Sequence, residues 1–191
     1  FAREVVAPVA AKSDAEDRFP CDFLKRVFSA GLMNLLVPAE LGGAGLSCVS
    51  HSLVLEELAW ACTGINTILA GNMLAALPLL IAANEQQRQK YLRGLIDGKE
   101  TEQGREPIFA CYACSEPDAG SDVAAIRCEA RRDGARYVVN GVKRWITNAE
   151  VADWGVLFAV TDAKDKRRRL SCFVFDLGQT GVSVGPSVKK L

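Results

Sequence analysis

The chain has 191 residues, of which 49% are hydrophobic and 24% charged, enough apolar material for one or two packed domains. Its 23 basic and 23 acidic side chains balance to a net charge of zero, so no overall basic field favours nucleic acid as a partner. The longest candidate apolar run, residues 74–83, contains Pro78 and is shorter than the ~18 residues that a membrane span needs. Composition therefore predicts a soluble globular protein without an integral membrane segment.

The pattern before residue 105 has helical spacing. The expected features are, in chain order, a helix over residues 1–12 with a kink or boundary at Pro8, a helix around residues 23–28 that ends at Gly31, a helix after Ser50 as its cap, a nearly all-apolar helix over residues 66–83, and a polar helix that Asn84 caps and that ends near Gly98. The glycine-rich segment 41–46 joins two helices rather than a strand to a helix, which argues against a Rossmann phosphate loop. Residues 99–107 are charged and predict an exposed loop. The first domain, residues 1–105, is expected to be all-helical.

After Ile108 the period becomes two, which is typical of strands. Strands are expected at residues 127–132, at residues 137–139 before the hairpin signal Asn140-Gly141, and at residues 143–147, 154–161, 170–176 and 182–184. Between the last two long strands, the run Arg167-Arg168-Arg169 favours a solvated loop over a phosphate clamp. The second domain, residues 106–191, is expected to be a small antiparallel barrel or sandwich, so the fold class is α+β.

Seven cysteines, an odd number, argue against a fully paired disulfide framework and favour a reducing compartment. Cys111 and Cys114 have a redox-like or zinc-like spacing, but a zinc site would need a second pair, and Cys128 and Cys172 are not spaced as one. These cysteines are expected to pack in the core or to line a site, and no metal site is predicted. The single histidine, His51, favours a helix-entry or surface role over catalysis.

Two polar clusters in the second half are candidates for ligand binding. Residues 112–122 take a strand into a turn rich in hydroxyls and carboxylates, where Gly120-Ser121 leaves the backbone open to a phosphate. Residues 143–148 form an expected strand that places Trp145 and Thr147 on one face. From the residues alone, a face for a flat heteroaromatic ring and a simple hairpin with a core tryptophan are equally supported.

These clusters and the helical half together resemble the acyl-CoA dehydrogenase family, most closely its medium-chain type, over essentially the whole chain. The matching segments are Phe1-Ala2-Arg3-Glu4 with Pro8-Val9-Ala10, Gly31-Leu32-Met33-Asn34, residues 38–46, Glu56-Glu57-Leu58-Ala59 with Cys62-Thr63-Gly64, Gly71-Asn72, residues 86–92, residues 115–122, and Asn140-Gly141-x-Lys143-x-Trp145-Ile146-Thr147-Asn148. The order of these segments along the chain is the order that the family has.

The resemblance implies non-covalently bound FAD and oxidation of a saturated acyl-CoA to the trans-2-enoyl-CoA. A carboxylate base removes an α-proton while a β-hydride passes to flavin N5, and the electrons leave to an electron-transferring flavoprotein. It also implies a homotetramer for the complete enzyme, a role in fatty acid β-oxidation, and a location in the mitochondrial matrix or the bacterial cytoplasm.

The resemblance also assigns roles to single residues. Tyr112, Cys114 and Ser115 would hydrogen-bond to or pack against the isoalloxazine ring, with Ser115 in place of the commoner threonine. Gly120 and Ser121 would lie near the FAD pyrophosphate, and Ser121 also near the thioester ligand. Trp145, followed by Ile146, would shield one flavin face, and the Thr147 hydroxyl would point at N5. Thr67, Ala70 and Leu74, with Gly71, would line the acyl pocket on one face of their helix, and the small Ala70 favours a medium or longer straight chain.

The family's catalytic base is a glutamate in a C-terminal helical domain, and the chain ends before that domain. Glu56, Glu57, Glu100 and Glu116 do not occupy that role, so no catalytic residue is expected in this chain, which is predicted to be a fragment that does not turn over acyl-CoA. Two alternatives stay open: an acyl-CoA oxidase-like or nitroalkane-oxidase-like flavoenzyme of the same fold, and a non-catalytic truncated paralogue that acts in binding or assembly.

Overall fold

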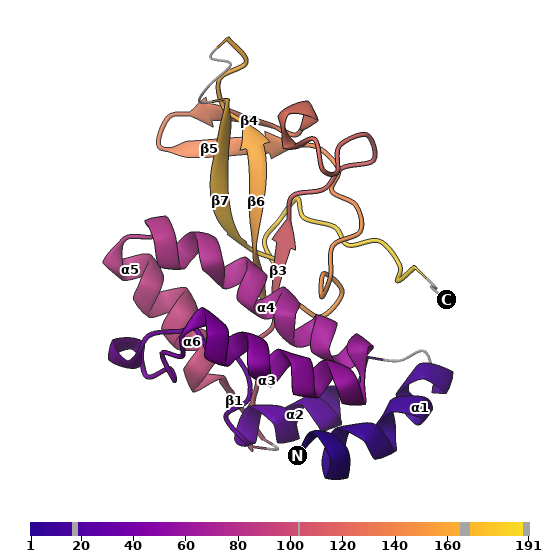
Figure 1. Cartoon of the computed structure of the whole chain (residues 1–191). Coiled ribbons are helices and arrows are strands. Elements are labelled where there is room, and N and C mark those ends of the chain that lie inside the picture. Colours follow the sequence, from indigo (N-terminus) through magenta and orange to yellow (C-terminus); the bar gives the residue numbers. More distant parts are fainter. Residues whose placement is uncertain (17–18, 103, 165–168, 189–191) are drawn as a thin grey trace. The chain divides into compact units, whose positions relative to one another are not determined.

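The computed structural model describes residues 1–16, 19–102, 104–164 and 169–188 (Figure 1). The chain divides into two compact units, one comprising Phe1–Phe109 with Gly185–Leu191 and the other comprising Ala110–Val184. The first is built mainly of helices and the second around a sheet. The expected α+β class, with a helical domain followed by a β domain, is therefore confirmed.

The helical unit follows the expected order of elements (Figure 1). Its elements are the π-helix η1 (Ala2–Val6), α1 (Ala7–Glu16), α2 (Cys21–Ser29), the 3-10 helix η2 (Ala39–Leu41), α3 (Cys48–Ala61), α4 (Thr63–Ala82), α5 (Glu85–Gln87), the π-helix η3 (Arg88–Leu92), α6 (Arg93–Asp97), and the short strands β1 (Lys99–Thr101) and β2 (Gly104–Glu106). The change from π to α hydrogen bonding between η1 and α1 falls beside Pro8, where the sequence predicts a kink or boundary.

Helix ends in this unit follow local chemistry. The stripe that begins α2 is buried at Phe23 and Leu24, and the chain leaves the helix through Gly31 with a left-handed φ of 69°. Asn84 caps the run that starts with α5 through a capping box, in which its Oδ1 accepts from the backbone N–H of Gln87 at 2.9 Å. The expectation for Ser50 is wrong: Ser47 is the N-cap of α3, and its Oγ accepts from the backbone N–H of Ser50 at 3.1 Å.

The apolar helix α4 packs against α3 and carries much of the helical core. Its buried residues are Ile65, Leu69, Gly71, Asn72, Met73, Ala75, Ala76 and Leu79. By length and composition alone α4 would also suit a bilayer, with a mean hydropathy of 1.8 and 44% of its apolar window buried. That is weak evidence, because the central helix of a helical domain meets the same criteria.

The charged segment after α6 is not the predicted loop. β1 and β2 pair antiparallel, with Lys99 opposite Glu106 and Glu100 opposite Arg105. Opposite charges face each other across this pair, which favours a hairpin even though most of its side chains are exposed.

The second unit contains one five-stranded sheet (Figure 1). Its strands are β3 (Ala110–Ala113), β4 (Glu129–Asp133), β5 (Arg136–Asn140), β6 (Trp154–Val160) and β7 (Leu170–Asp176), and a 3-10 helix, η4 (Val123–Ala125), precedes β4. β7 pairs antiparallel with one side of β6. On the other side of β6, β3 pairs with the first half of the strand. β4 pairs with the last residue of β6, with Glu129 opposite Val160.

The predicted antiparallel arrangement needs a correction, because β3 and β4 both run parallel to β6 and the sheet is mixed. The long connection between β3 and β6 is what allows a parallel pair, since parallel neighbours need a crossover. Two of the expected strands match closely: residues 154–161 and 170–176 form β6 and β7. Residues 182–184 form no strand.

Two further expectations in this unit are wrong. The hairpin turn is at residues 134–135, between the paired residues Asp133 and Arg136, and not at Asn140-Gly141. The predicted strand at residues 143–147 is an irregular segment, in which Trp145 has a φ of 64°. A left-handed residue cannot continue a pleated strand, so Trp145 and Thr147 do not share a strand face.

Candidate functional site

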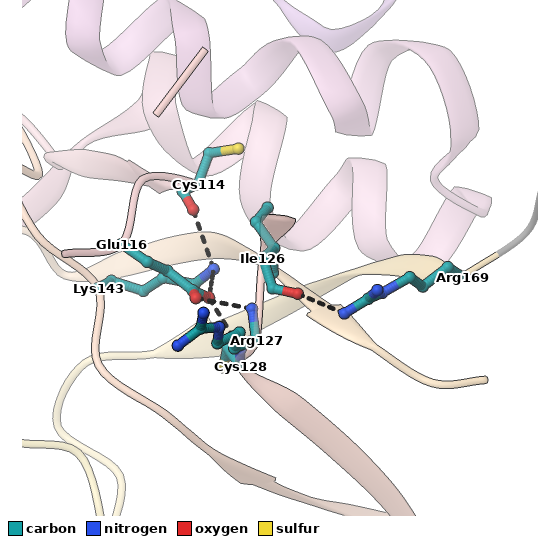
Figure 2. Close-up of polar contacts among 7 residues, drawn as sticks. All are labelled: Cys114, Glu116, Ile126, Arg127, Cys128, Lys143 and Arg169. Atoms are coloured by element: carbon teal, nitrogen blue, oxygen red, sulfur yellow. Dashed lines mark hydrogen bonds and ion pairs between the residues drawn. The ribbon is translucent and has the colours of Figure 1, made fainter. Parts of the chain in front are cut away.

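The centre of the candidate site is the buried carboxylate of Glu116, which lies in the connection after β3 (Figure 2). Its Oε2 accepts from the backbone N–H of Arg127 at 2.7 Å, and its Oε1 accepts from the backbone N–H of Cys128 at 2.9 Å. Lys143 Nζ donates to the same Oε1 at 2.9 Å and to the carbonyl oxygen of Cys114 at 3.0 Å. One carboxylate therefore ties three segments of the chain together.

The charge state of Glu116 follows from these contacts. Burial by itself raises the pKa of its carboxyl group, but the hydrogen bond from Lys143 and the backbone N–H groups of Arg127 and Cys128 outweigh it. The pKa of Glu116 therefore lies below its ordinary value of 4.5. At neutral pH the group is an ionised acceptor, and an ionised carboxylate is the partner that an ammonium group requires.

The turn after Glu116 is closed by two backbone hydrogen bonds and leaves the following residues, Gly120 and Ser121, exposed. The Glu116 N–H donates to the Ala119 carbonyl at 2.8 Å, and the Ala119 N–H returns a bond of 3.3 Å to the Glu116 carbonyl. Beyond this bridge, a Cβ on Gly120 would meet no described residue other than its two chain neighbours within 4 Å, and Ser121 is exposed. The backbone at Gly120-Ser121 is thus accessible, as a phosphate-binding turn requires.

The irregular segment that carries Trp145 is held at both ends. The Arg144 N–H donates to the Ser115 carbonyl at 2.9 Å, and Asn148 Nδ2 donates to the Ala110 carbonyl at 3.3 Å. Between these bonds the Trp145 side chain is 54% exposed, with the Arg144 guanidinium 4.6 Å from its ring centroid. An exposed, pinned indole offers a flat surface to a ring-shaped ligand.

The structure brings several predicted flavin contacts into one region. The carbonyl oxygens of Cys114 and Ser115 accept hydrogen bonds from Lys143 Nζ and the Arg144 N–H, respectively. These two donors directly precede Trp145. Ile146 is half-buried and Thr147 is exposed. Tyr112 lies in β3, half-buried, with its ring 5.2 Å from that of Phe158, and burial raises its pKa.

Two residues of the site were not singled out from the sequence. The sequence places both in polar clusters and in family motifs but gives neither a contact, and it excludes Glu116 as the catalytic base. The sequence does contain an indication of this pair, because each residue lies within one of the two polar clusters and their charges are opposite. Without a fold, however, nothing indicates that positions 27 residues apart in sequence meet.

The predicted acyl-pocket residues lie on α4 in the helical unit. Thr67 and Leu74 are exposed and Ala70 is half-buried, so they lie on the side of α4 that the helical core leaves uncovered. The Thr67 hydroxyl donates to the Thr63 carbonyl at 2.8 Å. Gly71, expected on the same face, is buried instead.

The cysteines and the arginine run have other surroundings. Within the described ranges no cluster of three or more histidine, cysteine or acidic side chains could hold a metal ion. Cys111 is buried, and burial raises its pKa to about 11. Arg167 and Arg168 lie outside the described residues, whereas Arg169 is half-buried and donates to the Ile126 carbonyl at 2.8 Å (Figure 2).

Comparison with known proteins shows the family to which the chain belongs. Residues 1–99 match the model of the acyl-CoA dehydrogenase N-terminal domain, and residues 111–191 match that of the acyl-CoA dehydrogenase middle domain. The chain belongs to the acyl-CoA dehydrogenase family. The resemblance drawn from its sequence is therefore confirmed.

Individual relatives support the same assignment. The chain is 35% identical to "Probable medium-chain specific acyl-CoA dehydrogenase 2, mitochondrial" of Caenorhabditis briggsae, over all of this chain and 46% of that protein. It is also 35% identical to "Short-chain specific acyl-CoA dehydrogenase, mitochondrial" of Mus musculus, over all of this chain and 45% of that protein. The solved structure "FAD complex of PigA" superposes with a TM-score of 0.88 at 27% identity, over all of this chain and 48% of that chain.

The chain thus spans slightly less than half the length of the curated relatives that it matches. The family uses FAD, in agreement with the cofactor prediction and with the group named in the PigA structure. The exposed indole of Trp145 and the open turn at Gly120 fit such a group, since one offers a flat apolar surface and the other accessible backbone.

Proposed function

We propose that this chain supplies the flavin-binding region and part of the acyl-binding region of an FAD-dependent acyl-CoA dehydrogenase. The observation that carries the proposal is the joining of the two polar clusters. Lys143 and Arg144 bond to the carbonyls of Cys114 and Ser115, and the exposed indole of Trp145 follows immediately.

In this proposal each exposed group has a task. When bound, FAD supplies the acceptor for the hydride that leaves the acyl chain. Trp145 presents its indole to one face of the flavin ring, and Thr147 offers an exposed hydroxyl as a donor. Tyr112, Cys114 and Ser115 border the ring, with Ile146 beside Trp145. The open backbone at Gly120 and the Ser121 hydroxyl receive the pyrophosphate, and Ser121 also the thioester.

The acyl chain is proposed to lie along the uncovered side of α4, at Thr67, Ala70 and Leu74. Ala70 is small, so a medium or longer straight chain finds room there. One relative named for medium-chain substrates and one named for short-chain substrates are each 35% identical to this chain. Experiment can decide the preferred length of the acyl group. Activity confined to four-carbon substrates would contradict this proposal.

No residue of this chain is proposed as the catalytic base, so the 191-residue chain by itself should not oxidise acyl-CoA. The complete enzyme is proposed to form a homotetramer, to act in fatty acid β-oxidation and to pass electrons to an electron-transferring flavoprotein. Its proposed location is the mitochondrial matrix, in line with the names of the relatives, or the bacterial cytoplasm.

An anaerobic titration of the full natural polypeptide with octanoyl-CoA tests the proposal. We expect a yellow protein whose visible flavin band bleaches on addition. In Thr147→Val, loss of the hydroxyl should slow bleaching by roughly 100- to 1000-fold, since removing one such donor has effects of that order. Thr180→Val, a matched change at another exposed threonine, should bleach like the natural protein.

The other outcomes separate the alternatives. A yellow protein that does not bleach would contradict the proposed substrate class. A colourless protein that also fails to take up added FAD would favour the non-catalytic paralogue. Rapid reoxidation of the bleached protein by oxygen would favour the oxidase-like reading over the dehydrogenase.

A further inference from the structure

We propose that the Lys143–Glu116 ion pair is a positioning device that sets the register between the two flavin-facing segments. The inference rests on the proposed function, because it concerns the same site. Lys143 and Glu116 are positioning residues here, and neither is proposed to touch the substrate.

The geometry of the pair points to register. Lys143 Nζ contacts the Cys114 carbonyl at 3.0 Å and Glu116 Oε1 at 2.9 Å, and the neighbouring N–H of Arg144 contacts the Ser115 carbonyl at 2.9 Å. Two consecutive residues of one segment are therefore bonded to three consecutive residues of the other. A slip by one residue would break all of these contacts.

The register matters for the residue that follows. Trp145 has a φ of 64°, a backbone conformation that costs of the order of 1 kcal/mol or more for a residue other than glycine. Surrounding contacts must hold such a residue, and the bonds of Lys143 and Arg144 lie directly before it. The ion pair thus fixes where the exposed indole lies relative to Ser115.

A purely stabilising role is the simpler alternative. The side chains of Lys143 and Glu116 are only 12% and 7% exposed, so both charges are largely desolvated. A buried ion pair is often no better for stability than apolar residues of similar size, although removal of one partner is costly. Stability alone therefore does not explain a buried lysine at this position, and flavin affinity must be measured separately from stability.

The test uses the full-length protein stripped of FAD. Lys143→Met keeps an apolar stem of four atoms and removes the ammonium group. Lys25→Met is the matched control in the helical unit, because it also breaks a short ion pair, with Lys25 Nζ 2.7 Å from Glu106 Oε1 and side chains 29% and 24% exposed. The melting temperature, the Kd for FAD and amide exchange of the FAD-free protein are measured for each variant.

We expect Lys143→Met to raise the Kd for FAD by about tenfold or more and to speed amide exchange in residues 144–148, at temperatures where the protein is folded. Lys25→Met should lower the melting temperature and leave the Kd within about twofold of the natural value. A natural Kd in folded Lys143→Met, or an equal loss of affinity in Lys25→Met, would overturn the inference.

A second variant covers the case in which Lys143→Met does not fold. Glu116→Gln keeps the shape of the side chain but turns an NH2 group toward one of its donors, so the pair weakens without leaving a cavity. It should raise the Kd for FAD as well, and an unchanged Kd would overturn the inference. If the natural protein itself fails to bind FAD, the proposed function is wrong and the inference is overturned with it.

Discussion

Gly155 of β6 lies so close to Cys111 of β3 that no side chain fits between them. A Cβ at position 155 would lie 2.6 Å from Cys111 Sγ and 2.9 Å from Phe175 Cε1. Residue 155 is paired with Cys111 on one side and with Phe175 on the other, so strands on both sides limit the space. The absence of a side chain here lets β3 and β7 both close on β6.

Gly155→Ala should therefore lower the free energy of unfolding by about 1–3 kcal/mol, because the added methyl group overpacks the sheet. Urea unfolding of the purified protein measures this. Gly178→Ala is the control, since position 178 faces open space, and it should stay within about 0.5 kcal/mol of the natural protein. Equal effects of the two substitutions would show that β3 can move away from β6 at little cost.

Asn84→Ala should destabilise the protein by about 1 kcal/mol, because it removes the acceptor for the Gln87 N–H at the start of α5. Asn84→Asp retains an oxygen in that place and adds a negative charge at a helix N-terminus, so it should restore most of the loss. Thermal unfolding separates the two variants. An aspartate variant as unstable as the alanine variant would contradict the capping role.

Asn72 is fully buried in α4, where its Nδ2 donates to the Ile108 carbonyl at 3.0 Å and to Asn34 Oδ1 at 3.3 Å. Asn72→Leu should cost about 1–3 kcal/mol, since buried acceptors lose their donor. Asn66→Leu in the same helix is the opposite case: Asn66 Oδ1 is buried without a partner in the described part of the chain, so its removal should be neutral or stabilising. Chemical unfolding of both variants tests the contrast.

The stability of the protein should depend on the ionisation of Glu116. Because its folded pKa is below the unfolded value of 4.5, the ionised group stabilises the fold fully above that value, and the contribution disappears as the pH falls through the folded pKa. Glu116→Gln should be less stable at neutral pH and should lose less stability on acidification. Unfolding midpoints measured from about pH 7 to pH 3 show this as a smaller slope, and an unchanged slope would contradict it.

Cys111 should resist alkylation in the native protein, because it is 2% exposed and burial raises its pKa to about 11. Cys21 and Cys48 are exposed and should react first. Mass spectrometry after iodoacetamide treatment at about pH 8 locates the modified residues. Reaction of Cys111 at the rate of Cys21 would contradict its burial, and its reaction only in denaturant would support it.

The elements that the sequence predicts well are those defined by neighbours in the chain. The apolar runs at residues 154–161 and 170–176 become β6 and β7 almost unchanged, because each run is bounded by polar turn residues. The cap at Asn84 was also predicted, since a capping box spans only four residues. The motifs of the candidate site belong to this class too, and the family could be identified from them.

The position of the hairpin turn depends on contacts between residues that are distant in sequence. Asp133-Gly134 and Asn140-Gly141 both carry turn chemistry, but only the turn at residues 134–135 joins paired strands. A Cβ on Gly141 would lie 2.6 Å from Cys128 Sγ, so this glycine serves a close approach to the residue before β4. Contacts between residues distant in sequence thus override a strong local signal.

The sequence by itself therefore determined the helical and β halves, the cap at Asn84, two strands and the places of the polar clusters in the chain, because these depend on local pattern. Only the tertiary structure decided that β3 and β4 run parallel to β6 and that residues 143–147 leave the strand conformation. It also decided that Lys143, two residues before Trp145, meets Glu116. Buried polar groups must find partners wherever the fold places them, and periodicity along the chain does not encode those partners.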